Sequence, residues 1–153
     1  MTAIRLALAT VIAAAVGFAI HVIYGEGILQ TYIQQAADAG RLDSVDSGVP
    51  PHIAAIAFIT VLIPYSAKTA IYYWAGHLIP GQAPLVKGII YGLVLLCLDH
   101  QLLRMPIMNT VVGNPIDIAL LMSAESWAIE LLSGVIIAHL VPLRASPKPE
   151  YST

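Results

Sequence analysis

Charged residues are scarce in this chain of 153 residues. Lysine, arginine, aspartate and glutamate together make up 10% of it, whereas soluble domains average about 25%. Hydrophobic residues make up 58%, and the mean hydropathy is +0.81. These values exclude an ordinary soluble enzyme and indicate a multi-pass integral membrane protein. We expect it in the lipid bilayer of a cell membrane of the bacterial inner membrane type, as one helical domain.

Cysteine, basic surface and catalytic signatures are also lacking. Cys97 is the single cysteine, so no intrachain disulfide is possible, and within an apolar run it is expected to act as a small hydrophobic residue. A net charge of −2 provides no basic surface, so we expect no nucleic-acid partner. The chain contains no P-loop, GxSxG, HExxH or Cys-x-x-Cys motif, and it therefore carries no signature of soluble-type catalysis.

What the chain does contain is long apolar runs. A helix needs roughly 20 apolar residues to cross a bilayer, and four runs reach about that length. In the first run, Ala9, Ala13 and Gly17 recur at four-residue intervals, which favours the close approach of another helix. The sequence therefore predicts an all-α bundle of four membrane spans at residues 4–24, 52–79, 85–103 and 116–143.

The segments between these runs predict the topology. Residues 25–51 form the only long polar segment, and apolar residues at helical spacing predict a short amphipathic helix in it up to Gly40. Residues 105–115 are predicted to form a short loop. The lysines and arginines are more frequent on the side of the N-terminus, which predicts that both termini are cytoplasmic. Residues 144–153 are expected to form a disordered cytoplasmic tail.

Two ionisable residues lie deep within the predicted spans. Lys68 is 16 residues beyond the start of the second span (68 − 52), and Glu130 is 14 residues beyond the start of the fourth (130 − 116). At 1.5 Å per residue their depths are similar. We predict a polar contact between them, either a buried pair that holds two helices in register or part of a proton or ion path. In a third interpretation Lys68 extends toward the membrane surface. Tyr72 and Ser126 lie on the same polar stripes and are further candidates for the path.

A second group of ionisable residues is predicted nearer the outer surface. Glu125 is five residues from Glu130 and therefore faces about 140° away on the helix. Its estimated depth is closest to that of His21, Asp99 and His100. Imidazole and carboxylate groups together suit a transition metal or a proton relay. Alternatively, each is a polar group at a helix end wetted by headgroup water, and Glu125 marks a contact between oligomer subunits. The sequence identifies no particular metal or cofactor.

Three classes of function remain open. The first is a small transporter or channel-like protein, or a component of a membrane complex, with Lys68 and Glu130 on its path. The second is a membrane-embedded metal- or haem-binding redox protein or enzyme. His77 and His139 near the inner surface favour haem, but no ligand pair repeats at a fixed spacing on one helix. The third is an accessory or scaffold subunit, which packs in a homo-oligomer or against a partner in a membrane complex.

Overall fold

The computed structural model describes residues 2–42 and 51–143, without the side chains of residues 51–55 and 57. In this part of the chain 84% of the residues are helical and none lies in a strand, so the predicted all-α class is confirmed. The predicted tail, residues 144–153, lies outside the described residues. The elements are α1 (Thr2–Ile20), η1 (His21–Leu29), α2 (Gln30–Asp38), α3 (Pro51–Ala75), η2 (Gly76–Leu78), α4 (Pro84–Leu98), α5 (Arg104–Val111) and α6 (Ile116–Leu140).

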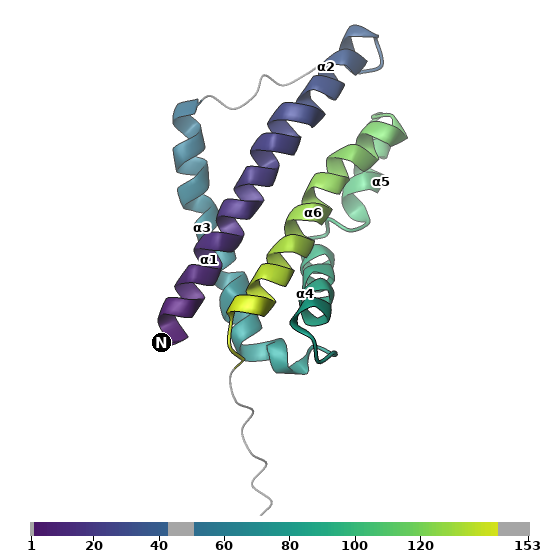
Figure 1. The fold of residues 1–153 in the computed structure, drawn as a ribbon. Coiled ribbons are helices and arrows are strands. Elements are labelled where there is room, and N and C mark those ends of the chain that lie inside the picture. The colour runs from purple at the N-terminus through teal and green to yellow at the C-terminus, as the bar shows by residue number, and fades with distance from the viewer. Residues whose placement is uncertain (1, 43–50, 144–153) are drawn as a thin grey trace, which may run out of the picture.

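The first helix is longer than predicted. α1, η1 and α2 form one continuous helix from Thr2 to Asp38, as Figure 1 shows, and η1 is a π-helix. The short helix predicted up to Gly40 is present as α2, but it continues the first helix without the predicted end at residue 24. Gly25 and Gly27 between the two patterns weaken a helix without ending it. The helix stops at Gly40, as predicted, where a φ of +69° is suited to glycine.

The predicted third span, 85–103, is interrupted. After α4, His100 takes a φ of 59°, and its N–H donates to the Cys97 carbonyl at 3.2 Å. The N–H of Gln101 donates to the Leu96 carbonyl at 2.9 Å. These two bonds close the helix end in the manner usually adopted by glycine. The chain then resumes as α5 where a loop was predicted. Hydropathy does not reveal the interruption, because apolar residues continue on both sides of it.

The remaining helices follow the prediction more closely. α3 begins at Pro51, continues through Pro64 and gives way to the short helix η2. α6 begins at Ile116 as predicted and ends at Leu140, three residues earlier than predicted (143 − 140). Among the described residues, two helices, Thr2–Asp38 and Ile116–Leu140, are long and apolar enough to cross a membrane, and Pro84–Leu98 is apolar but shorter.

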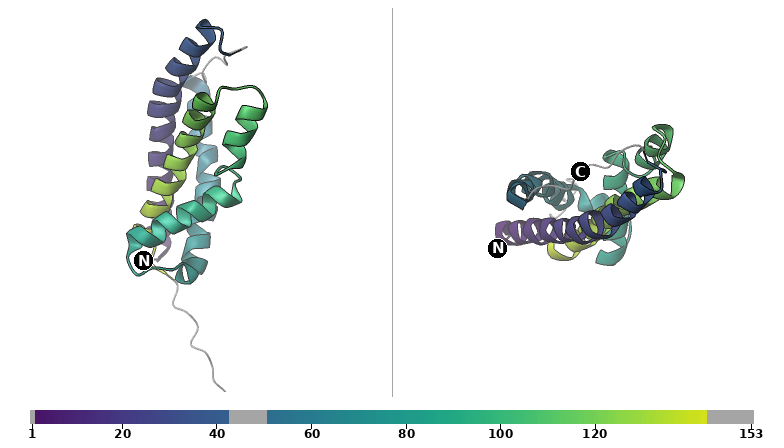
Figure 2. Two further views of the ribbon diagram at one scale, coloured as in Figure 1. Left: turned by 90° about the vertical axis from the view of Figure 1, so that its right-hand side faces the viewer. Right: turned by 90° about the horizontal axis from the view of Figure 1, so that it is seen from above.

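The helices pack around α6. The long first helix runs alongside α6, α3 packs on α1, and α4 and α5 pack on α6. Figure 2 shows α4 running obliquely to the long helices, so that the chain has to turn at its end before α5 continues upward. The start of α1 and the end of α6 lie at the same end of the bundle. This arrangement places the interruption between α4 and α5 beside the middle of α6.

Small residues set two of the helix contacts. Ala9 and Ala13 are fully buried, and a Cβ atom on Gly17 would overlap the Tyr65 hydroxyl. The predicted close approach of another helix to this stripe is therefore confirmed, with α3 as a partner. The second contact lies on α4, where Gly88 and Gly92 are four residues apart. This spacing of small residues is visible in the sequence and also favours close helix packing.

Candidate functional site

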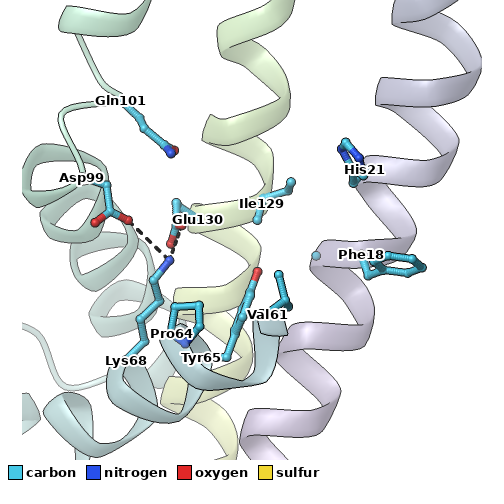
Figure 3. Close-up of a pocket in the computed structure, with 11 residues that line it drawn as sticks. Phe18, His21, Val61, Pro64, Tyr65, Lys68, Asp99, Gln101, Ile129 and Glu130 are labelled. Carbon is cyan, nitrogen blue, oxygen red and sulfur yellow. Dashed lines mark hydrogen bonds and ion pairs between the residues drawn. The ribbon is translucent and has the colours of Figure 1, made fainter. Parts of the chain in front are cut away.

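A cavity of about 390 Å³ lies among α1, α3, α6 and the chain just after α4. Figure 3 shows four ionisable side chains, a glutamine and several apolar side chains around it. The polar lining residues are Tyr65, Lys68, Asp99, Gln101, Glu130 and His21. The apolar lining residues are Gly17, Phe18, Val61, Pro64 and Ile129. A space of this volume, lined by apolar walls and a few convergent polar groups, has the usual character of a small-molecule site.

The centre of the cavity holds Lys68 between two carboxylates. Its ammonium group forms an ion pair with Oε1 of Glu130 and lies 3.5 Å from Oδ2 of Asp99. The side chains of Lys68 and Glu130 are 13% and 6% exposed, so Lys68 does not extend toward the surface. We name Lys68, Asp99 and Glu130 the central ion group. The structure thus brings the predicted pair together and adds Asp99, which the sequence analysis had assigned to another cluster.

Neighbouring side chains hold the central ion group in position. The Tyr91 hydroxyl donates to the backbone carbonyl of Lys68 at 2.6 Å. The centre of the Tyr65 ring lies 5.2 Å from the Lys68 ammonium, within the range of a cation–π contact. The Ser133 hydroxyl in turn donates to the Tyr65 hydroxyl at 3.2 Å. Within the described part of the chain, Oε2 of Glu130 is buried and receives no hydrogen bond.

The central ion group lies near the middle of α6. Glu130 is 14 residues from the start of the helix (130 − 116) and 10 from its end (140 − 130), or roughly 21 Å and 15 Å. Asp99 reaches this depth only because α4 ends there. The signal in the sequence was the polar run from Asp99 to Gln101 within an apolar segment. The C-terminal end of a helix carries a partial negative charge, which adds to that of the carboxylates.

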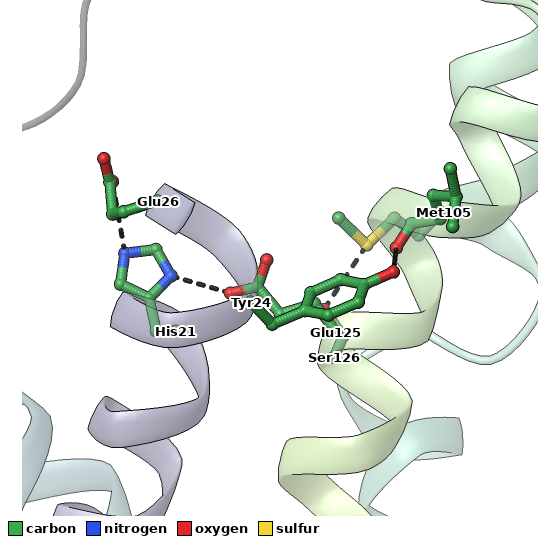
Figure 4. Close-up of polar contacts among 7 residues, drawn as sticks. His21, Tyr24, Glu26, Met105, Glu125 and Ser126 are labelled. Carbon is green, nitrogen blue, oxygen red and sulfur yellow. Dashed lines mark hydrogen bonds and ion pairs between the residues drawn. The ribbon is translucent and has the colours of Figure 1, made fainter. Parts of the chain in front are cut away.

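A second polar group surrounds His21 and is shown in Figure 4. Nδ1 of His21 lies 2.7 Å from Oε1 of Glu125, and Nε2 lies 3.7 Å from Oε1 of Glu26. Gly25 allows this approach, because a Cβ atom there would lie 2.9 Å from the Glu125 carboxylate oxygens. We name His21, Glu26 and Glu125 the histidine group. Glu125 therefore faces the first helix of its own chain; a contact between subunits at this position stays a prediction.

The predicted cluster of His21, Asp99, His100 and Glu125 is divided between two places. His21 pairs with Glu125, whereas Asp99 belongs to the central ion group. His100 is exposed at the end of α4, where it closes the helix. Across residues 2–42 and 51–143, no three or more histidine, cysteine, aspartate or glutamate side chains are placed to hold a metal ion.

The other candidates named from the sequence lie outside the cavity lining. The ring of Tyr72 is buried against that of Tyr91, with centres 5.1 Å apart. The hydroxyl of Ser126 contacts the sulfur of Met105 at 3.7 Å. His77 and His139 are exposed, and Nδ1 of His139 lies 2.8 Å from the Val135 carbonyl of its own helix. The side chains of Tyr72 and Ser126, which belong to the two polar stripes, therefore contribute to helix packing.

Comparison with known proteins adds no assignment. No family model matches the chain, and no curated protein or solved structure matches it.

Proposed function

We propose that the chain is an integral membrane protein with four spans and cytoplasmic termini. Support comes from the outer surface, where large apolar side chains are exposed on every long helix. Examples are Ile4 on α1, Ile63 on α3, Leu98 on α4 and Leu132 on α6. A soluble monomer rarely exposes so much continuous apolar surface. In this proposal α4 and α5 together form the third span, because 15 residues of α4 rise only about 22 Å.

We further propose that the protein is a small transporter that passes protons through the central ion group. One observation carries this proposal: Lys68 lies between Asp99 and Glu130, in a cavity at a helix interruption near the middle of the bundle. Ionisable groups at that depth are costly and usually serve transport. Interrupted helices are tolerated in membranes where they line a cavity, and transporters use them to build their binding sites.

The geometry supports a simple exchange of partners. The Lys68 ammonium is shared between a buried carboxylate and one that is 42% exposed. Protonation of Asp99 or Glu130 removes one partner and shifts Lys68 toward the other. His21, which carries an imidazole, also lines the cavity. Protons entering from the exposed side of Asp99 therefore meet a carboxylate, an ammonium and an imidazole within one cavity.

Proton flux in vesicles tests the transport proposal. The purified protein is reconstituted into liposomes with an entrapped pH dye, and a potassium gradient with valinomycin imposes a potential. Wild type should acidify the lumen at least tenfold faster than protein-free liposomes, and Asp99→Asn and Glu130→Gln should abolish the difference. Asp38→Asn is the matched control, because that carboxylate only accepts a hydrogen bond from Gln34 on the exposed end of α2. Equal flux with and without protein would reject transport and favour the scaffold alternative.

Cysteine labelling tests the topology. Asp38, at the end of α2, and Gln82, just before α4, are exposed, and the end of α2 and the start of α4 lie at opposite ends of the bundle. With Cys97→Ser as background, Asp38→Cys should react with an impermeant maleimide only from outside the cell. Gln82→Cys should react only in inverted vesicles. Reaction of both positions from the same side would reject the four-span arrangement.

A further inference from the structure

The central ion group carries an excess of negative charge. Asp99 and Glu130 contribute two carboxylates and Lys68 contributes one ammonium group, so the balance within this group is one negative charge. The partial charge at the end of α4 has the same sign. Excess charge away from water is costly unless a counter-charge is present. A cation therefore fits this cavity better than an anion, which would meet two carboxylates and an ammonium group that is already paired.

An oxygen of Glu130 also lacks a donor. Its Oε1 is occupied by Lys68, while Oε2 is buried and has no hydrogen bond within the described part of the chain. An unmet buried acceptor costs on the order of 1–3 kcal/mol, and more where the group is charged. Oε2 is reached by a ligand only when the Glu130 carboxylate turns toward the cavity; a ligand that donates N–H groups would then remove this cost, whereas an aprotic cation would not.

Lys68 itself shows how the cavity receives an alkylammonium group. Its ammonium contacts two carboxylates, and the face of Tyr65 lies 5.2 Å away. This combination of carboxylate and aromatic ring is the usual recognition of an organic ammonium ion. The opposite part of the wall is apolar and contains Phe18, Val61 and Ile129. The remaining space therefore suits a molecule with one ammonium head and a small apolar body.

We propose that the cavity binds a small apolar primary amine in its ammonium form, with the head at Asp99 and Glu130 and the body toward Phe18. This inference rests on the proposed transport function and names the substrate class of the same cavity. Binding would compete with Lys68 for the carboxylates, so the ligand and the proton share the same acceptors. The amine and the proton can therefore replace each other at these carboxylates, and no further site is needed.

Binding is tested with benzylamine as the probe, using the full chain in detergent micelles. Isothermal titration at pH 7 should give saturable binding of benzylamine. Binding of benzyl alcohol, which has the same body and no charge, should be at least tenfold weaker. Asp99→Asn should weaken benzylamine binding at least tenfold, and Asp38→Asn should leave it unchanged. Phe18→Ala, which removes part of the apolar wall, should weaken benzylamine binding.

Three results would overturn the inference. Equal binding of benzylamine and benzyl alcohol would show that the cavity selects only for apolar bulk. If sodium chloride displaced bound benzylamine as effectively as further benzylamine hydrochloride does, the cavity would be an alkali-ion site. Absence of saturable binding to the folded wild type, verified by its circular dichroism, would reject the site. The micelle assay measures binding and the liposome assay measures transport. Absence of binding with intact proton flux would reject only this inference. Absence of proton flux with intact binding would reject only the proposed function.

Discussion

The two sides of α6 are packed by different means. Toward α4 the helices touch through their backbones, because Gly88, Gly92 and Gly134 leave no side chain between them. Toward α3 the two helices are separated by long side chains such as Lys68 and Tyr65, which border a cavity. Backbone contact excludes space for a ligand, whereas side-chain contact leaves a space whose groups can rearrange. α6 therefore has one face that is close-packed against α4 and another face that borders the cavity.

The largest expected effect comes from mutations on the side of α6 that borders the cavity. Lys68→Met leaves Glu130 and Asp99 without their counter-charge, and such a loss in a buried pair costs about 3–5 kcal/mol. Glu130→Gln should cost less, because Lys68 keeps Asp99 as a partner at 3.5 Å. The double change should recover much of this stability, because no lone buried charge remains between the pair. Chemical unfolding in detergent, arranged as a double-mutant cycle, measures the coupling. Additive losses would contradict the pairing of Lys68 with Glu130.

The next largest effect is expected from mutations at the glycine contact between α4 and α6. In Gly92→Ala the new Cβ would lie 2.8 Å from the backbone oxygen of Glu130, so α4 and α6 have to separate. Overpacking of this kind costs roughly 1–3 kcal/mol. Gly27→Ala is the control, since its nearest neighbour would be 3.7 Å away. Thermal unfolding should show a lower midpoint for Gly92→Ala alone, and equal midpoints for the two variants would mean that the helices are not in backbone contact.

A smaller effect of opposite sign is expected at the interruption after α4. His100 adopts a left-handed conformation, which costs a residue with a side chain roughly 1–2 kcal/mol. His100→Gly should therefore raise the unfolding midpoint by part of this amount while the benzylamine affinity stays unchanged. His100→Ala, which keeps the strain, serves as the control. A gain from alanine as large as that from glycine would point to the imidazole ring and not to the backbone as the source of strain.

The smallest effect is expected far from both sides, where Arg41 donates to both carboxylate oxygens of Asp117 at 3.0 and 2.9 Å. This hydrogen bond raises the pKa of the Arg41 guanidinium, which therefore remains charged at any working pH. The pair is exposed to solvent, and such pairs are screened by salt. Arg41→Gln should lower the unfolding midpoint slightly in low salt and have no effect in 1 M sodium chloride. An effect that persists in high salt would indicate a role in packing.

The chain's own pattern determined the helical class, the starts of α3, α4 and α6 near their prolines, and the depth of Lys68 and Glu130. These features depend on composition, on local turn residues and on the constant rise of a helix, all of which are read along the chain. Their pairing also followed, since two opposite charges at one depth in apolar surroundings have few other partners.

Only the tertiary structure decided where Asp99 belongs, whereas the approach of His21 to Glu125 was predicted from their depths. Residue counting measures depth along a helix, but it does not give the direction in which neighbouring helices face or the tilt of α4. The interruption at His100 turns Asp99 toward Lys68, and the π-helix η1 brings His21 to Glu125. Both changes alter the helix path through backbone hydrogen bonds, which hydropathy does not record. The cavity, formed where four segments meet, therefore exists only in the folded chain.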